Sequence, residues 1–458
     1  MISFIPCARD FKKIQTIVGR YMPNSVVDLL ENGISPSIKQ IIIEHPYIDK
    51  DFRDTYYNDF SKRFADIARD SVRLHFFLEP DNITPDNYAG FVTLRDTAEF
   101  TLGRSYISPK AIRGVTNGYC CLARYPVQLR GIDLHVFAFP WMQQDGNISR
   151  CAHIAAWSIV RYFSQKYTYY PEKTLHEITA HDSTTRRIPS RGATVEQIAQ
   201  IFRKNRFEPE IYFREILNET KSQFDRLVYT FIESGIPFVA GLFKRQHAVA
   251  VVGHGALSSP DNAFGTHDGI VDSADLIESI LISDDNDLPY KMATTYEDED
   301  KITVDQIDVV VVPFYEKMYL DAQVLYEKIL PLLEANLIRN PSGKTLIRRV
   351  FMTSSHSLKC KILEESKDET YRDVHLALQM PKFVWIAEYA NITEYKDGQV
   401  RARAIFDATM LNPFDVSFIS LKVEKEICVY PRSKDVPEIF ELEQKTERRY
   451  ENNLRRLS

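Results

Sequence analysis

One helix-length segment constrains the fold of this chain more than any other. From Cys151 to about Tyr167, apolar residues recur at helical spacing and extend almost all the way round the predicted helix. The positions that form this surface are Ala152, Ala155, Ala156, Trp157, Ile159, Val160, Tyr162 and Phe163. A helix without a polar face cannot lie at the surface, so we expect it to be buried. With 458 residues, the chain can enclose such a helix without disulfides or a structural metal.

Helices and then strands follow the buried segment. Thr194 and Gln197 form a capping-box pattern that predicts a helix start, and a further helix is predicted over 222–234. The strands predicted after it are 237–243, 247–255, 278–284 and one within 301–314. Helices and strands also mix on either side of this part. We therefore predict an α+β protein with an N-terminal region (1–131), a core region (132–315) and a C-terminal region (316–458).

The flanking segments carry their own expectations. Residues 49–70 are predicted to form an amphipathic helix, and residues 88–140 are rich in strands. Residues 257–275, with several Gly, Ser and Asp, are expected to be an inserted loop. The charged tail from about Pro437 is expected to be a solvated helix.

Charge and cysteine content exclude several classes of protein. The chain has 57 basic and 63 acidic residues, a net charge of −6, which gives no electrostatic case for nucleic acid or an anionic membrane as the main partner. No apolar stretch approaches the roughly 20 residues of a membrane-spanning helix, and the N-terminus lacks a secretory signal pattern. The six cysteines form no CxxC pair, so neither a zinc ribbon nor a thioredoxin motif is predicted. We expect a reduced, cytoplasmic protein.

Three residues occur in the order that a thiolate nucleophile requires. Cys151 stands where the buried helix should begin, and the partial positive charge of a helix N-terminus favours a thiolate. His247 opens a predicted strand, and Asp284 ends the next apolar strand, where it could accept a hydrogen bond from the imidazole. Gln143 and Gln144 precede Cys151, and either side-chain amide could join the Cys151 N–H in an oxyanion hole.

These segments resemble the papain-like cysteine peptidases. The sequence QHAVAVVGHG at 246–255 resembles their histidine strand, ILISD at 280–284 resembles the strand before their Asn or Asp, and QDGNISRCAHIAAWS at 144–158 resembles their cysteine helix. Bacterial relatives that process leader peptides, with Asp as the third member, are the nearer match in layout. The resemblance covers about residues 139–314.

The resemblance implies a fold and a set of roles. A buried cysteine-bearing helix would pack on an antiparallel sheet that carries the histidine. Cys151 would be the nucleophile, His247 the general base and then acid, and Asp284 the orienting residue. Gln144, or else Gln143, would be the oxyanion donor. No metal or organic cofactor would be needed, and the substrate would be a peptide or protein.

The sequence also departs from the family pattern. His247 and Asp284 are 37 residues apart (284 − 247), about twice the separation in compact members, and the segment 257–275 accounts for the difference. The gap from Gln144 to Cys151 is one residue longer than in papain. The Trp that follows the third member in papain is absent, and Asn286 is therefore an alternative orienting residue.

Less specific interpretations stand beside these roles. Cys151 could be a small buried hydrophobe. We interpret His153 as a core histidine and His254 as structural, because an odd separation places His254 on the opposite face of the strand from His247. The acidic sequence at 284–287 is interpreted as a solvated turn, since it lacks the pattern of a calcium loop.

Three further candidates carry little weight as sites. His45, Asp49 and Asp51 could be metal ligands, but an N-cap and surface role is favoured.

On the same triad, a transglutaminase-like or N-acyltransferase reaction is an alternative to hydrolysis. A catalytically silent interaction module with this scaffold is a second alternative.

Overall fold

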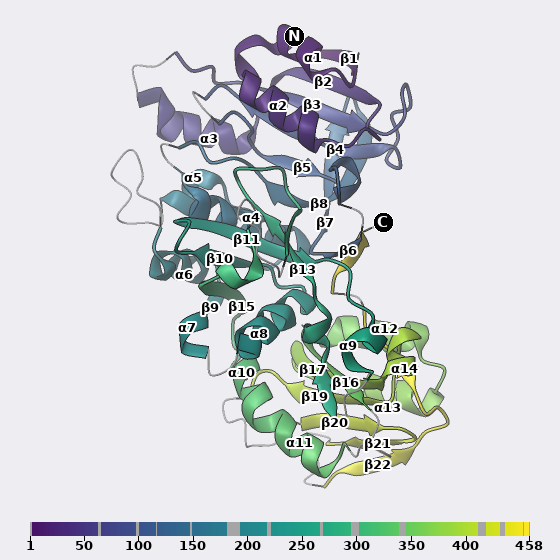
Figure 1. The fold of residues 1–458 in the computed structure, drawn as a ribbon. Coiled ribbons are helices and arrows are strands. Elements are labelled where there is room, and N and C mark those ends of the chain that lie inside the picture. Colours follow the sequence, from purple (N-terminus) through teal and green to yellow (C-terminus); the bar gives the residue numbers. More distant parts are fainter. Residues whose placement is uncertain are drawn as a thin grey trace.

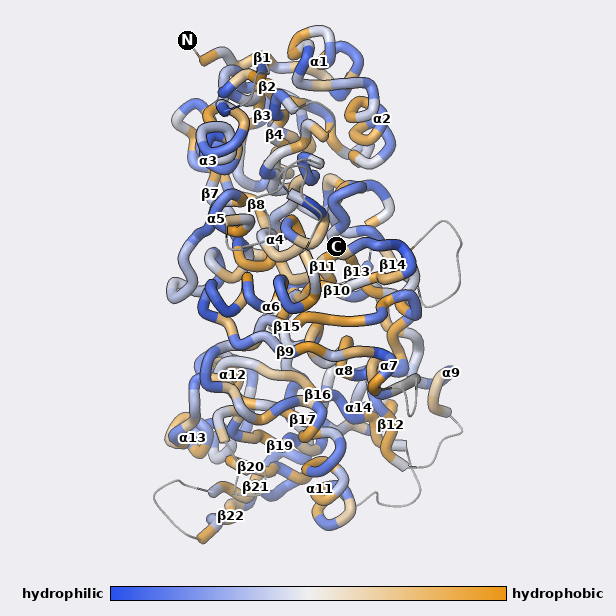
Figure 2. The backbone as a smooth tube through the Cα atoms, turned by 90° about the vertical axis from the view of Figure 1, so that its left-hand side faces the viewer, coloured by the Kyte–Doolittle hydropathy of each residue, from blue (hydrophilic) through white to orange (hydrophobic). Residues whose placement is uncertain are grey.

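The computed structural model describes most of the chain. The described residues are 2–62, 66–97, 100–115, 117–146, 149–180, 193–217, 221–265, 269–294, 302–338, 345–410, 418–430, 436–451 and 453–457. Three large sheets follow one another along the long axis of the molecule, with the N-terminal sheet at one end and the C-terminal sheet at the other (Figure 1). Hydrophobic stretches coincide with the strands of the sheet in the middle (Figure 2).

The first sheet is antiparallel and has seven strands. Its order is β1 (Ser3–Ala8), β2 (Gln40–Tyr47), β3 (Ser71–Phe77), β4 (Tyr88–Arg95), β5 (Ser105–Ile107), β8 (Ile132–Trp141) and β7 (Ala123–Leu129). The helices of this part are α1 (Phe11–Val18), α2 (Asn24–Gly33) and α3 (Lys50–Asn58). Strand β8 pairs with β5 and β7. Its residues therefore belong to the first sheet, although the core region was expected to begin at residue 132.

The second sheet carries the candidate site. Its main path is β14 (Lys291–Thr294), β13 (Ser279–Ser283), β11 (His247–His254), β10 (Phe238–Leu242), β15 (Val309–Tyr315) and β9 (Phe207–Phe213), all antiparallel. The helices around it are α4 (Cys151–Lys166), α5 (Leu175–Thr179), α6 (Val195–Lys204), α7 (Arg214–Leu217) and α8 (Lys221–Glu233). Helix α4 packs against β11 and β8, and its residues from Ala152 to Phe163 are buried, as predicted.

The third sheet is formed by the C-terminal region and one strand from the insertion. Its order is β12 (Ile270–Asp272), β16 (Leu346–Ser354), β17 (Phe383–Asn391), β19 (Ala402–Asp407), β20 (Phe418–Val423), β21 (Glu426–Val429) and β22 (Glu438–Glu441). The accompanying helices are α10 (Ala322–Val324), α11 (Leu330–Asn336), α12 (Ser355–Glu365), α13 (Glu369–Ala377) and α14 (Ile392–Lys396).

The inserted segment 257–275 is not simply a loop. It contains α9 (Pro260–Phe264) and β12, and β12 pairs in parallel with β16. The expectation of a loop was wrong because the apolar residues Ile270 and Val271 complete an edge of a sheet whose other strands lie more than 70 positions later. The insertion therefore joins the second and third sheets. Residues 266–268 of this segment lie outside the described residues.

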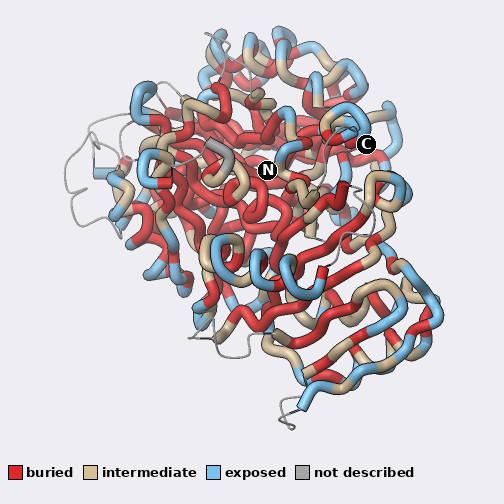
Figure 3. Tube along the Cα trace, turned by 60° about the horizontal axis from the view of Figure 1, so that its bottom comes forward, coloured by how far each residue is buried: buried red, intermediate tan, exposed pale blue. Residues whose placement is uncertain are grey.

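The charged tail is also different from its prediction. In place of a solvated helix it forms β22, β23 (Glu447–Arg448) and β24 (Arg455–Leu457). Strand β24 pairs with β6 (Gly118–Cys120), which pairs in turn with β11 of the second sheet. Tyr450 and Leu457 are buried by this return path, and burial of these side chains outweighs the helical tendency of the charged residues. Across the molecule, buried residues gather in the interior and exposed residues lie mainly at the periphery (Figure 3).

The overall class is the one predicted, a mixed α+β protein built on antiparallel sheets. The helix predicted over 49–70 is shorter in the structure, where α3 ends at Asn58, and residues 63–65 lie outside the described part. Among the described residues, no helix is both long and apolar enough to cross a membrane.

Candidate active site

Cys151 is the first residue of α4 and is half-buried. His153 caps the N-terminus of α4, because its Nδ1 accepts a hydrogen bond from the Arg150 N–H at 3.3 Å. His153 is itself fully buried, so its predicted structural role is confirmed. The thiol therefore lies at the positive end of the helix dipole, while a neighbouring imidazole fixes the start of the helix.

A buried carboxylate on another element holds α4 in place. Asp51 of α3 accepts hydrogen bonds from Trp157 Nε1 at 3.1 Å and from the Arg161 guanidinium at 2.9 Å. Asp49 is the N-cap of α3, as predicted, and accepts from the Phe52 N–H. The surface position expected for Asp49 and Asp51 is wrong, because both are almost fully buried. The N-terminal region thus sets the position of the cysteine helix.

His247 is the first residue of β11 and pairs with Leu242 of β10. Its Nε2 lies 2.9 Å from Asp284 Oδ1, and its ring is also hydrogen-bonded to the Cys151 side chain. Because Asp284 occupies the Nε2 side, Nδ1 is the nitrogen left for the thiol. One imidazole therefore connects the three residues that the sequence analysis selected.

The charges around His247 favour its protonated form. Burial lowers the pKa of His247, but the hydrogen bonds to Asp284 and Cys151 and the negative charges of those groups outweigh it and raise the pKa to about 10. Burial raises the pKa of Asp284, but the hydrogen bond and charge of His247, the Asn286 N–H and the charge of Lys291 together outweigh it, and the net pKa is lowered. The raised pKa favours an imidazolium beside the Asp284 carboxylate.

Asp284 follows β13 and is fixed through both its main chain and its side chain. Its carbonyl oxygen accepts from Trp141 Nε1 at 2.7 Å, and its Oδ1 also accepts the Asn286 N–H at 3.0 Å. The side-chain nitrogen of Asn286 is 3.4 Å from His247 Nε2. Asp284 is closer to the ring and is an acceptor only, so it matches the orienting role better than Asn286 does.

Asp285 is a functional candidate that the sequence analysis missed. Its carboxylate Oδ1 lies 3.9 Å from His247 Nε2, and its side chain is only 2 % exposed. Burial, with the nearby charge of Asp284, raises the pKa of Asp285 to about 7 in spite of the neighbouring His247. The interpretation of 284–287 as a solvated turn is therefore wrong for its first two residues. The signal in the sequence was the second Asp directly after an apolar strand.

The two glutamines before Cys151 have different positions. Gln143 is buried, and its side-chain oxygen accepts the Leu102 N–H at 3.2 Å while its main-chain N–H donates to Leu102 O at 3.0 Å. These bonds engage Gln143 in the first sheet. Gln144 is half-buried, and Asp145 and Ser149 hold the following loop by reciprocal hydrogen bonds. Asn147 and Ile148, which complete this loop, lie outside the described residues.

His254, at the other end of β11, belongs to a separate cluster. Its Nε2 lies 2.8 Å from Glu233 Oε1, and Glu233 also binds Arg349 of the third sheet. The predicted structural role of His254 is confirmed. The neighbouring Gly253 and Gly255 allow close packing, because a Cβ at either position would meet an atom at 2.2 Å.

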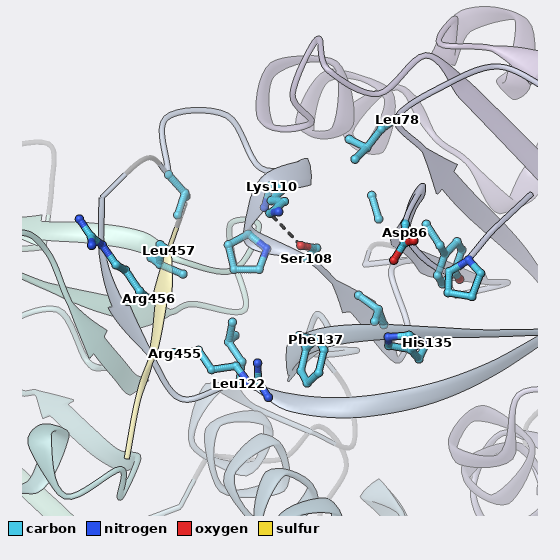
Figure 4. A pocket seen from close by; sticks show the side chains of 16 residues that line it. Leu78, Asp86, Ser108, Lys110, Leu122, His135, Phe137, Arg455, Arg456 and Leu457 are labelled. Carbon is cyan, nitrogen blue, oxygen red and sulfur yellow. Dashed lines mark hydrogen bonds between the residues drawn. The ribbon is translucent and has the colours of Figure 1, made fainter. Parts of the chain in front are cut away.

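Two other features lie apart from the residues around His247. A cavity of about 410 Å³ lies between the first sheet and β24, and the Arg455 guanidinium at its edge stands 3.7 Å above the Phe137 ring (Figure 4). It contains none of the residues around His247. Cys360 lies 3.7 Å from His356 Nε2 one turn away on α12, in the interior of a helix rather than at its N-terminus.

No family model, curated protein or solved structure matches this chain. The site is therefore defined by its own geometry alone.

Proposed function

We propose that this protein is a papain-like cysteine hydrolase that cleaves a peptide or isopeptide bond. The observation that carries the proposal is the position of one imidazole, His247, between the Cys151 thiol and the Asp284 carboxylate. Its protonated form would stabilise a Cys151 thiolate, which is the nucleophilic form of the residue.

The reaction would take place in two halves. The Cys151 thiolate attacks the carbonyl carbon, and the tetrahedral oxyanion accepts hydrogen bonds from the Cys151 N–H and from the side-chain amide of Gln144. His247 gives its proton to the leaving amine as the C–N bond breaks, which leaves a thioester. Water then attacks the thioester while His247 takes up a proton, and the C–S bond breaks to release the acid.

A separate observation supports each of the other roles. Gln144 is assigned by elimination, because Gln143 is buried and its side chain is held at Leu102 by the hydrogen bond that its amide oxygen accepts from the Leu102 N–H. The hydrogen bond between Asp284 and His247 Nε2 would keep the ring in the orientation in which its other nitrogen can meet the sulfur. All six cysteines are free thiols, which fits action in a reducing compartment such as the cytoplasm.

The direct test is hydrolysis of a mixed peptide library by the intact protein, read by mass spectrometry. Wild type should release new peptide termini, while Cys151→Ala should not and should keep the same thermal unfolding midpoint. Cys360→Ala is the matched control, since it removes another thiol that lies beside a histidine. Equal hydrolysis by wild type and Cys151→Ala would overturn the proposal. Adding an amine to the same reaction shows whether water or an amine is the preferred acceptor.

A further inference from the structure

The acidic turn beside His247 has the geometry of a metal site. His247 Nε2 and one carboxylate oxygen each from Asp284 and Asp285 all lie within 4.8 Å of one another. The two nitrogen–oxygen distances are 2.9 Å to Asp284 and 3.9 Å to Asp285. Two ligands of a tetrahedral Zn²⁺, each about 2.0–2.2 Å from the ion, stand roughly 3.3–3.6 Å apart. The observed distances lie on either side of that range.

Asp285 supplies an independent reason to expect a ligand. Its side chain is 2 % exposed, and neither carboxylate oxygen makes a full hydrogen bond with a residue in the described part of the chain. The N–H groups of Gln144 and of Asp285 itself lie near enough only to favour the ionised form. Burying a carboxylate without partners is costly, and such groups in native proteins usually pair with a charge, a water or an ion.

We propose that His247, Asp284 and Asp285 form a binding site for a divalent transition-metal ion, with Zn²⁺ as the best match. One imidazole and two carboxylates suit Zn²⁺ better than Mg²⁺ or Ca²⁺, which prefer six or more oxygen ligands. The two carboxylates balance the charge of the ion, and a water completes the tetrahedron. The Asn286 N–H donates to Asp284 Oδ1 at 3.0 Å and so holds the Asp284 carboxylate in its orientation.

A metal at this position would regulate the proposed hydrolase. The ion takes the lone pair of Nε2, and the proton that Nε2 shared with Asp284 passes to solvent. His247 then stays bound to the metal, and its remaining Nδ1–H, no longer part of an imidazolium, is a weaker acid for protonation of a leaving amine. The site would act as a reversible inhibitory switch. This consequence depends on the proposed function, whereas metal binding itself does not.

The test measures binding without any substrate. Co²⁺ is titrated into the full-length Cys151→Ala protein, its visible absorption is followed, and Zn²⁺ is used to displace it. Stoichiometric binding in the micromolar range is expected. Asp285→Asn should weaken it by at least ~10-fold, since a direct ligand should matter at least as much as the supporting residues of a metal site. Asp287→Asn is the matched control, because Asp287 is a half-exposed neighbour that pairs with Lys291.

Each outcome decides something. Binding that is lost in Asp285→Asn and kept in Asp287→Asn supports the site. No binding, or equal binding by all variants, overturns it. Binding that occurs only when Cys151 is present also overturns it, because the metal would then use the thiol on the other side of the ring. If the metal binds as expected but wild type shows no hydrolysis, the site stands and the proposed function fails.

Discussion

Replacing Asp284 by Asn separates the two candidates for the orienting residue. The substitution keeps the shape of the side chain but removes the negative charge 2.9 Å from His247 Nε2. The hydrogen bond to that carboxylate, together with its charge, helps to raise the pKa of His247 to about 10, against the effect of burial. With the carboxylate gone, the imidazolium is less stable and would support a Cys151 thiolate less.

The expected change in the alkylation rate of Cys151 follows from the fraction of the cysteine that is thiolate. A cysteine with an ordinary pKa near 8.5 is about 1 % thiolate at pH 6.5, whereas a full ion pair makes it nearly all thiolate. Asp284→Asn should therefore slow alkylation of Cys151 by iodoacetamide at pH 6.5 by about 10- to 100-fold. At pH 9, where an ordinary thiol is largely ionised, the two proteins should differ much less.

The comparison variant is Asn286→Ala. Its amide nitrogen is 3.4 Å from Nε2 and carries no charge, so its removal should change the alkylation rate by no more than about threefold, which corresponds to a neutral hydrogen bond. The rates are read by mass spectrometry of the Cys151 peptide across the pH range. An unchanged rate in Asp284→Asn, or a larger loss in Asn286→Ala, would refute the assignment.

Three further predictions concern the oxyanion loop, the buried charges and acid stability. Gln144→Ala should lower kcat by about 10²- to 10³-fold, while Gln143→Ala should mainly lower the free energy of unfolding, by about 1–3 kcal/mol, since it leaves the buried Leu102 N–H without its acceptor. Loss of activity in Gln143→Ala alone would reverse the assignment, and loss in both variants or in neither would contradict it. Glu233→Gln removes the buried carboxylate that binds Arg349 and should cost about 3–5 kcal/mol in urea unfolding, and a loss below 1 kcal/mol would contradict this role. Burial lowers the pKa of His375 to about 4, so its neutral form stabilises the fold above pH 6.5 and that contribution is lost as pH falls toward 4. His375→Asn should lose less unfolding free energy than wild type as the pH falls over this range. The same pH dependence in both proteins would contradict the prediction.

Local patterns in the sequence predicted the main parts of the site. The apolar surface of α4 and the capping box at Thr194 and Gln197 depend on residues within one or two turns, so both appear in the structure as expected. His247 opens β11 because a polar residue before an apolar run is a local signal of a strand end. The order of cysteine, histidine and aspartate followed from these elements.

The parts that were missed depend on distant partners. Strand β24 forms because its neighbour β6 offers free main-chain groups, and β12 forms because β16 does. Nothing within either segment signals such pairing. Asp285 was missed for a different reason, since the turn geometry decides which of two adjacent carboxylates is buried, and sequence alone does not fix that geometry.

The central claim is that Cys151 is a nucleophile activated by its position, and competitive alkylation of the native protein at pH 6.5 tests it most directly. All six cysteines are free, and Cys360 also lies beside an imidazole, so it serves as the internal comparison. Mass spectrometry of each cysteine peptide should show Cys151 reacting at least ~10-fold faster than Cys360, because it alone combines a helix N-terminus with a carboxylate-supported histidine. A Cys151 that reacts no faster than Cys360 would contradict the account.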